Sequence, residues 1–183
     1  MEITHRTQLP DLLKHLGLPM IGAEIGVASG FNSLDLMRNG MEKLYCVDNW
    51  GTIEGVTGDG ASSQEWHQGN YESTLKLLKP FGDKVTILKG MSVEMAKEIP
   101  DNSLGLLYHD GNHTYLGVKE DIEAYWAKLV ENGIMAFHDY ANTWDYGVKD
   151  AVDEFAEENG LEVFLIPEDK IEDAGAYIIK PKK

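Results

Sequence analysis

The stretch Ala23-Glu24-Ile25-Gly26-Val27-Ala28-Ser29-Gly30 decides how this chain folds. It overlaps the end of an apolar run, Met20–Ala23, and precedes Phe31–Arg38, a segment with helical spacing. A strand that ends in a glycine turn and leads into a helix forms a site for a small polar ligand, because the glycines let the backbone approach it and the first N–H groups of the helix face it. Glu24 is expected inside the turn, where its charge disfavours a phosphate and suits a ligand with hydroxyls and a positive charge.

Apolar, strand-like runs alternate with helix-like segments along the rest of the chain. Several runs are continuous, as expected for a parallel sheet that is covered on both faces. The alternation predicts a doubly wound, mostly parallel, seven-stranded α/β sheet of Rossmann-like type, in a single domain over residues 1–183. The expected strands are Met20–Ile25, Leu44–Val47, Lys84–Leu88, Leu104–Tyr108, Ile134–Phe137, Leu161–Ile166 and Ala176–Ile179.

Helices are expected where apolar residues recur at intervals of three and four positions. Gly40 and Gly160 follow two of these stripes and are expected to end their helices. The segment Pro167–Gly175 is only a loop, so the last two strands are expected to form an antiparallel hairpin. The apolar stripes are Phe31, Leu34 and Met37; Tyr115, Val118, Ile122, Tyr125 and Leu129; and Val148, Val152 and Phe155.

The composition indicates which classes of partner and which cell compartment to expect. The 183 residues include 16 Lys and Arg against 31 Asp and Glu, a formal charge of −15. Such an excess of acid repels phosphate backbones and anionic lipids, so neither nucleic acid nor a membrane is expected as a partner. The single cysteine, Cys46, lies in an apolar run and is expected to be a buried strand residue. Without a signal-peptide pattern or a membrane-spanning run, a cytoplasmic protein is expected.

Acids and histidines follow the expected strands at their carboxyl ends. In an open α/β sheet the ligand pocket lies beyond those ends, so these residues mark the site. They are Glu24 and Gly26 after the first strand, Asp48 after the second, Gly90-Met91-Ser92 after the third, His109-Asp110-Gly111-Asn112-His113 after the fourth, and His138-Asp139-Tyr140 after the fifth.

Two nucleoside cofactors compete for this arrangement. Asp48 ends the second strand, where a carboxylate can accept both hydroxyls of a ribose. A nicotinamide cofactor calls for G-x-G-x-x-G with a pyrophosphate on the helix start, whereas this chain has Gly26-x-x-x-Gly30 and an acid two residues earlier. S-adenosylmethionine brings an ammonium, a sulfonium and no phosphate, so an acidic pocket favours it.

Two later motifs carry a family resemblance. They are Asp110-Gly111-Asn112-His113-Thr114-Tyr115 and Phe137-His138-Asp139-Tyr140. Together with Glu24-x-Gly26-x-x-x-Gly30 and Asp48, they make the chain resemble a class I S-adenosylmethionine-dependent methyltransferase from Gly22 to Ile179. The chain is most similar to a small family with Asp-Gly-x-His-x-Tyr and Phe-His-Asp motifs, and more broadly to Mg-dependent O-methyltransferases that act on sugars and catechols.

The resemblance implies positions for the cofactor. The backbone from Gly26 to Gly30 would hold its methionine end, Asp48 its ribose, and Asp110 would lie near its amino group. Trp50 could instead anchor the loop, and Ser92 could cap a helix as well as border the adenine. The implied cofactor-binding residues are Glu24, Gly26, Ala28, Ser29, Gly30, Asp48, Asn49, Trp50, Met91, Ser92 and Asp110.

The resemblance also implies a catalytic group of Asp110, Asp139 and His113. The two aspartates would hold Mg²⁺, since close carboxylates repel each other unless a proton or cation lies between them and oxygen ligands favour a hard cation. His113 would be the base that removes the acceptor's proton. Catechol-type enzymes have an amide residue directly after the second aspartate, whereas this chain has Tyr140.

The third metal ligand is left open among Asn142, His138 and water. His138 precedes Asp139 on an expected strand, so alternation would point the two side chains to opposite faces and away from one ion. The other possibilities are that Asp110 serves the cofactor alone, that Asp139 caps a loop, and that His113 only bonds the backbone at a helix start. No short ligand pair such as H-x-x-x-H accompanies the histidines to indicate zinc.

The predicted activity is methyl transfer from S-adenosylmethionine to a hydroxyl of a small acceptor, a sugar or a natural-product diol. The alternatives are a module that binds S-adenosylmethionine without methyl transfer, and a non-haem-iron hydroxylase on a related fold. Acceptor contacts would come from the glycine-rich loop Asn49–Gln64, which is either a lid or a simple surface loop, from Tyr140–Tyr146 with its aromatic residues Tyr140, Trp144 and Tyr146, or from a partner subunit in a homodimer.

Overall fold

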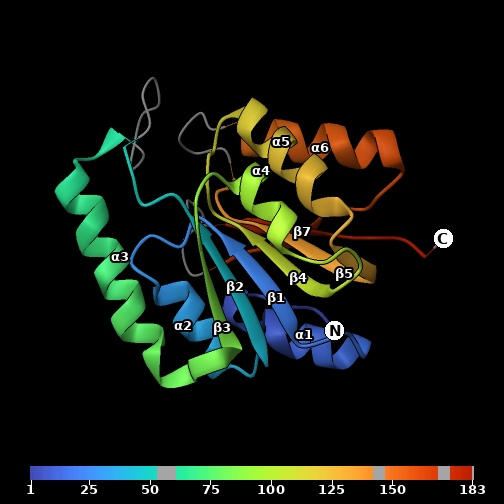
Figure 1. The fold of residues 1–183 in the computed structure, drawn as a ribbon. Helices are drawn as coiled ribbons and strands as arrows, with labels where there is room; N and C mark the ends of the chain where they lie inside the picture. The colour runs from blue at the N-terminus through green and yellow to red at the C-terminus, as the bar shows by residue number, and fades with distance from the viewer. Residues whose placement is uncertain (53–60, 142–146, 169–173, 183) are drawn as a thin grey trace.

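Seven strands form one mixed sheet between two layers of helices (Figure 1). The computed structural model describes residues 1–52, 61–141, 147–168 and 174–182. The strand order is β3-β2-β1-β4-β5-β7-β6, and the predicted doubly wound α/β fold with its C-terminal antiparallel hairpin is confirmed. The strands are β1 Ile21–Ile25, β2 Lys43–Asp48, β3 Val85–Lys89, β4 Leu104–His109, β5 Leu129–Phe137, β6 Phe164–Ile166 and β7 Gly175–Ile179.

The helices divide between the two faces of the sheet. Helices α4, α5 and α6 cover one face and α1 and α2 the other, with α3 beside the β3 edge (Figure 1). Each face has its own apolar core, and Cys46 is fully buried in the core beneath α1 and α2, as predicted. The helices are α1 Leu9–Leu16, α2 Phe31–Arg38, α3 Gln64–Leu78, α4 Ser92–Met95, α5 Tyr115–Trp126 and α6 Val148–Asn159. Among the described residues, no helix has the length and apolar content to cross a bilayer.

Several predicted boundaries are wrong for local reasons. Leu129 was expected on the helix, but α5 stops at Trp126 and Leu129 begins β5, where it pairs with Leu104. Leu161 was expected to begin a strand, but its N–H bonds the Ala156 carbonyl and ends α6 instead. The expected helical segment Phe31–Arg38 is confirmed as α2, although Phe31, the first residue of its apolar stripe, is 64% exposed.

Strand register brings the predicted site residues to one edge of the sheet. Ile25 of β1 pairs with Val47 of β2 and with His109 of β4. His109 in turn pairs with Phe137 of β5. The residues that follow these strands, Gly26, Asp110 and His138, therefore start from the same level, and Asp48 ends β2 beside them.

Candidate active site

The backbone of the turn after β1 packs closely against the end of β4. The Gly26 N–H donates to the Val47 carbonyl at 2.9 Å, and the Asp110 N–H donates to the Ile25 carbonyl at 2.8 Å. Gly26 has φ 84°, and a Cβ at this position would lie 1.9 Å from the Asp110 carbonyl oxygen. Only glycine allows this approach, which places the first turn of the site beside Asp110.

Asp48 holds this turn from the side. Its Oδ2 accepts from the Ala28 N–H at 2.8 Å and its Oδ1 from the Trp50 N–H at 2.7 Å. Both Ala28 and Trp50 have left-handed backbone, with φ 45° and 42°, and such strain persists only where the surroundings hold it in place. A carboxylate has four acceptor positions, so Asp48 keeps capacity for further donors.

Trp50 has the role that was weighed as the alternative. Its indole N–H donates to the Ala28 carbonyl at 2.8 Å, and its ring lies 4.9 Å from that of Tyr71 on α3. The side chain is 1% exposed, so it offers no free surface to a ligand in this conformation. Trp50 is an anchor of the loop, and its expected place near the adenosine stays a prediction.

Two of the residues expected around the adenosine, Asn49 and Met91, lie in contact near the protein surface. Asn49 Nδ2 lies 3.9 Å from Met91 Sδ, and Met91 is half exposed. Helix α4 starts at Ser92, so the cap position is Met91 and the capping role considered for Ser92 is wrong. The Ser92 carbonyl accepts from the Tyr125 hydroxyl at 2.8 Å, which fixes the start of α4 to α5.

Glu24 does not lie in the turn, contrary to the prediction. It is a residue of β1, 1% exposed, and it accepts from the Asn32 side chain at 3.0 Å and from the Ser33 hydroxyl. Burial raises the pKa of Glu24 to about 8, although both hydrogen bonds act in the opposite direction. The side chain therefore positions the start of α2 as a largely uncharged group at neutral pH, and its charge gives no repulsion toward a pyrophosphate.

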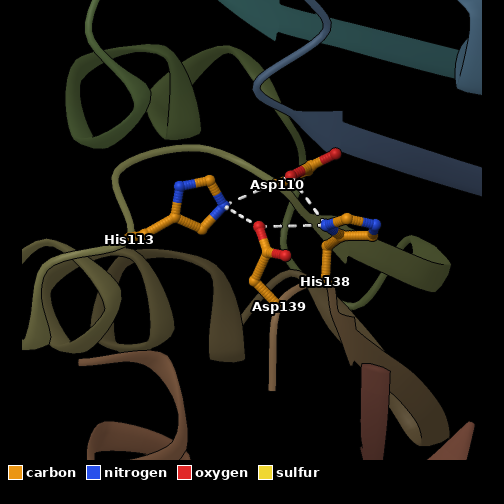
Figure 2. A group of neighbouring side chains, drawn as sticks. All are labelled: Asp110, His113, His138 and Asp139. Carbon is orange, nitrogen blue, oxygen red and sulfur yellow. Dashed lines mark hydrogen bonds and ion pairs between the residues drawn. The ribbon is translucent and has the colours of Figure 1, made fainter. Parts of the chain in front are cut away.

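Two carboxylates and two imidazoles converge beyond β4 and β5 (Figure 2). His113 Nε2 lies 3.3 Å from Asp110 Oδ1 and 3.1 Å from Asp139 Oδ2. His138 Nδ1 lies 3.5 Å from the same Asp110 oxygen and 3.1 Å from the same Asp139 oxygen. These four ligand atoms, one from each residue, are all within 4.8 Å of one another, and we refer to Asp110, His113, His138 and Asp139 as the His–Asp cluster.

The cluster shifts the protonation of its own members. Burial alone would lower the pKa of His113, but its contacts with Asp110 and Asp139 outweigh this and raise the pKa to about 9. For Asp139, burial acts to raise the pKa, but the two histidines outweigh it and hold the pKa well below its usual range. At neutral pH His113 therefore carries a proton in this arrangement, which does not suit the predicted role of a base.

His138 was expected to point away from Asp139, and this is wrong. Strand β5 ends at Phe137, and Asp139 has left-handed backbone with φ 54°. The alternation of side chains therefore stops before Asp139, and the two residues turn into the same space. The sequence signal for such a break is weak, because a non-glycine residue with positive φ leaves no mark beyond the preference of Asp and Asn for it.

Sequence reasoning missed Arg6 altogether. Its Nη1 lies 3.2 Å from His138 Nε2, on the side of the imidazole that faces away from the carboxylates. Arg6 is held in turn by Glu168, whose Oε1 accepts from the Arg6 N–H at 2.8 Å and whose Oε2 lies 3.6 Å from Nη1. No local pattern links residues this far apart in the chain.

Comparison with known proteins agrees with this geometry. Residues 23–140 match the family model described as a methyltransferase domain, which is more than half of the chain. The chain belongs to this methyltransferase family. No curated protein matches it.

Solved structures of several methyltransferases share its fold. The O-methyltransferase NovP has a TM-score of 0.68 at 21% identity, over 96% of this chain and 78% of that one. The calicheamicin methyltransferase CalS11 has a TM-score of 0.70 at 20% identity, over 96% and 80%. The O-methyltransferase TomG from Streptomyces achromogenes, in complex with SAM, has a TM-score of 0.69 at 14% identity, over 97% and 80%. The fold is that of a class I S-adenosylmethionine-dependent methyltransferase.

Some predictions for this methyltransferase fall outside the described residues. Part of the expected lid, residues 53–60, is among them, as are Asn142 as a metal ligand and the aromatic residues Trp144 and Tyr146. Tyr140 is described and buried, and its hydroxyl donates to Asp153 of α6. It packs against the neighbouring helix, one of the two roles considered for it.

Replacing Glu24 by Gln is expected to stabilise the methyltransferase more at pH 8 than at pH 5. The folded-state pKa of Glu24 is about 8 against an ordinary 4.5, so its stability contribution is present below pH 4.5 and is lost as the pH rises toward 8. Glutamine keeps the shape and never ionises. Urea unfolding of both proteins at the two pH values measures the difference, with the exposed Glu42→Gln as the control for removal of one acid. A difference that does not change with pH would contradict the burial argument.

Proposed function

We propose that this methyltransferase moves the methyl group of S-adenosylmethionine to a hydroxyl oxygen of a small acceptor, a sugar or a natural-product diol. The observation that carries the proposal is the His–Asp cluster, which lies directly beside the Gly26 turn because the Gly26 backbone contacts the backbone of Asp110. A cofactor held at the turn would present its methyl group next to polar groups that can orient a hydroxyl.

The transfer itself needs few chemical groups. The acceptor oxygen attacks the methyl carbon, the carbon–sulfur bond breaks, and S-adenosylhomocysteine leaves as a neutral thioether. The oxygen becomes strongly acidic as it gains the methyl group, so its proton can pass to a carboxylate even of low pKa. Asp110 and Asp139 are the acceptors at this place, and we assign the proton to this pair instead of to His113, which already carries one.

A divalent cation fits the cluster, since oxygens of both carboxylates lie within 4.8 Å of each other and would hold a cation where the protonated His113 now supplies the positive charge. Asp110 and Asp139 are the residues that would hold Mg²⁺, which when bound lowers the pKa of an acceptor hydroxyl. In the reaction, Asp110 and Asp139 themselves would orient the acceptor's oxygens and take up the proton.

The direct test uses methyl-labelled S-adenosylmethionine with a panel of sugars and diols, with and without a chelator. Labelled ether product supports the proposal. If the turnover rate is the same with and without the chelator, the reaction does not need a cation. Calorimetry with S-adenosylhomocysteine and NADH comes first, because tighter binding of NADH would overturn the choice of cofactor. Binding of the cofactor with no turnover on any acceptor supports a binding module, and an iron signal with hydroxylated product supports a hydroxylase.

Replacing Asp48 by Asn is expected to weaken S-adenosylhomocysteine binding by about ten- to a hundredfold, the worth of a hydrogen bond to a charged group. The amide puts a donor where the backbone N–H groups of Ala28 and Trp50 now donate, and it removes the acceptor proposed for the ribose. Calorimetry measures the loss, with the exposed Asp83→Asn as control. An affinity equal to that of the unmodified protein would remove Asp48 from the cofactor site.

A further inference from the structure

The sheet fixes only half of the His–Asp cluster. Asp110 and His138 are the first residues after β4 and β5, and the backbone N–H of each still bonds a carbonyl of the neighbouring strand. His113 and Asp139 lie further along the chain, beyond the strands, yet His113 Nε2 is 3.1 Å from Asp139 Oδ2. Contacts outside the sheet therefore hold His113 and Asp139 in place.

Asp139 is held through the residue that follows it. Tyr140 is buried in the core beneath α5 and α6, and its hydroxyl donates to Asp153 of α6. Lys149, one turn earlier on α6, donates to the same hydroxyl oxygen at 3.3 Å and also bonds Asp153. The left-handed backbone of Asp139, with φ 54°, persists only where its surroundings hold it, and the fixed Tyr140 ring provides such an anchor.

His113 is held to the same helix in two ways. The N–H of Gly147, the residue before α6, donates to the His113 carbonyl at 2.9 Å. Two residues after His113, Tyr115 donates its hydroxyl to Glu154 of α6, which also accepts from Lys119 at 2.6 Å. A Cβ on Gly147 would lie 2.2 Å from the Tyr115 nitrogen, so the backbone at the start of α6 lies directly against this segment.

The two tyrosines therefore bind neighbouring residues of one helix. Asp153 and Glu154 are consecutive on α6, and consecutive side chains of a helix point about 100° apart, so α6 binds one tyrosine on each flank. Figure 1 shows α6 alongside α5 over the same face of the sheet.

The hydroxyl groups do more for position than for stability. The two carboxylate side chains are 41% and 38% exposed, so each bond is expected to add little to the free energy of unfolding. Phenylalanine would fill the same apolar space as either tyrosine, so packing alone does not require a hydroxyl at these positions. A hydroxyl bonded to a carboxylate instead fixes the direction of the ring, and with it the backbone that carries the ring.

We propose that Tyr115 and Tyr140 are positioning residues for the methyl transfer. By binding both tyrosines, α6 sets the separation of His113 and Asp139, and with it the place that the acceptor oxygen takes between them. The inference rests on the proposed function for its catalytic meaning. The geometry of the His–Asp cluster itself can be measured without any acceptor.

The first test observes the cluster directly by nuclear magnetic resonance. Correlation spectra of the histidine ring nitrogens are recorded at one pH for the ¹⁵N-labelled full chain and for Tyr115→Phe and Tyr140→Phe. The ring signals of His113 and His138 are assigned from their Gln variants. We expect both sets of signals to shift when either hydroxyl is removed, while the signals of His15, which is exposed on α1, stay in place.

The second test separates turnover from cofactor binding. With saturating cofactor and the best acceptor found, each Phe variant is expected to lower kcat about fivefold, the worth of one net hydrogen bond. Affinity for S-adenosylhomocysteine, measured by calorimetry, is expected to stay within about twofold, because neither tyrosine contacts the Gly26 turn in any interaction described above.

Variants of the α6 carboxylate identify the bond responsible. Asp153→Asn keeps an acceptor oxygen for the Tyr140 hydroxyl and is expected to keep kcat within about twofold. Asp153→Leu removes the acceptor and is expected to match Tyr140→Phe. Combining Asp153→Leu with Tyr140→Phe is expected to cause no further loss, since both changes break the same bond.

Two controls separate positioning from a general loss of stability. Glu157 is exposed on α6, so Glu157→Gly weakens the helix without removing either tyrosine bond. Tyr177→Phe removes a hydroxyl in the core on the opposite face of the sheet. Both variants are expected to leave the histidine ring signals and kcat unchanged. Urea unfolding checks that each variant is folded under the conditions of measurement.

Ring signals of His113 and His138 that stay unchanged in both Phe variants would overturn the inference. Equal changes in Glu157→Gly would overturn it as well, because any weakening of α6 would then have the same effect. Shifted ring signals with an unchanged kcat would reject the positioning role in catalysis. If the unmodified protein methylates no acceptor, the proposed function fails, and the ring spectra still decide whether α6 holds the cluster.

Discussion

Replacing Gly26 by Ala is expected to destabilise the protein by at least about 3 kcal/mol, because an added Cβ would meet backbone atoms at a position with positive φ. The new Cβ would lie 1.9 Å from the Asp110 carbonyl oxygen and 2.7 Å from the Gly111 Cα, both of which are backbone atoms that no rotamer change can move. The ends of β1 and β4 would have to separate, and the turn would lose its place beside the His–Asp cluster. Urea unfolding measures the stability, and calorimetry with S-adenosylhomocysteine measures cofactor binding at the site.

Gly160 provides the matched control for this substitution. It has φ 63°, also in the left-handed region, but no atom lies within 4 Å of the position of an added Cβ. Gly160→Ala therefore carries the backbone strain alone, about 1 kcal/mol. If the two variants lost the same stability, the close approach of β1 to Asp110 would not be what requires glycine at position 26.

Replacing Asp139 by Asn is expected to slow methyl transfer by at least about a hundredfold, the usual lower size of an acid–base contribution. The change is isosteric, but it removes the charge that faces His113 and His138 at 3.1 Å each. The acceptor then loses a proton acceptor, and a cation loses a ligand. Cofactor binding is expected to stay within about threefold, because Asp139 does not contact the Gly26 turn in any interaction described above.

Asp101→Asn is the control, since this exposed aspartate precedes β4 at the other end of the strand and pairs only with Lys128 among the described residues. The rate is measured with saturating cofactor on the best acceptor found. An Asp139→Asn protein that turns over at the full rate would limit this residue to a structural role, the loop-capping alternative considered from the sequence. A parallel loss of cofactor binding would instead indicate a disturbed fold.

The fold could be predicted because its signals are local. The glycines at positions 26 and 30, the continuous apolar runs and the stop at Gly160 each act within a few residues, and strand register then brings the polar ends together. The family motifs at Asp110 and Phe137 added the expectation of a methyltransferase. The strands and turns that position the site residues could therefore largely be predicted from the sequence.

The details of the site were less visible, because they depend on backbone conformation and distant contacts. Glu24 was assigned to the turn since an apolar pattern does not show where a strand ends, and its burial reverses the argument from its charge. His138 was placed on the wrong face because the left-handed conformation of Asp139 interrupts the strand. The contact between Arg6 and His138 could not be predicted, because no local sequence pattern links residues so far apart in the chain.

The contact between Arg6 and Glu168 has a practical consequence for handling the protein. Glu168 binds both the backbone and the guanidinium of Arg6, and its own N–H bonds the Thr4 carbonyl, so these N-terminal residues are tied to Glu168 and, through Arg6, lie beside His138 of the His–Asp cluster. A purification tag fused ahead of them would lie close to the cluster and is expected to disturb these contacts. A tag at the other terminus follows Lys180, whose ammonium bonds the Trp126 and Leu129 carbonyls at the far rim of the sheet, and would leave the chemistry undisturbed.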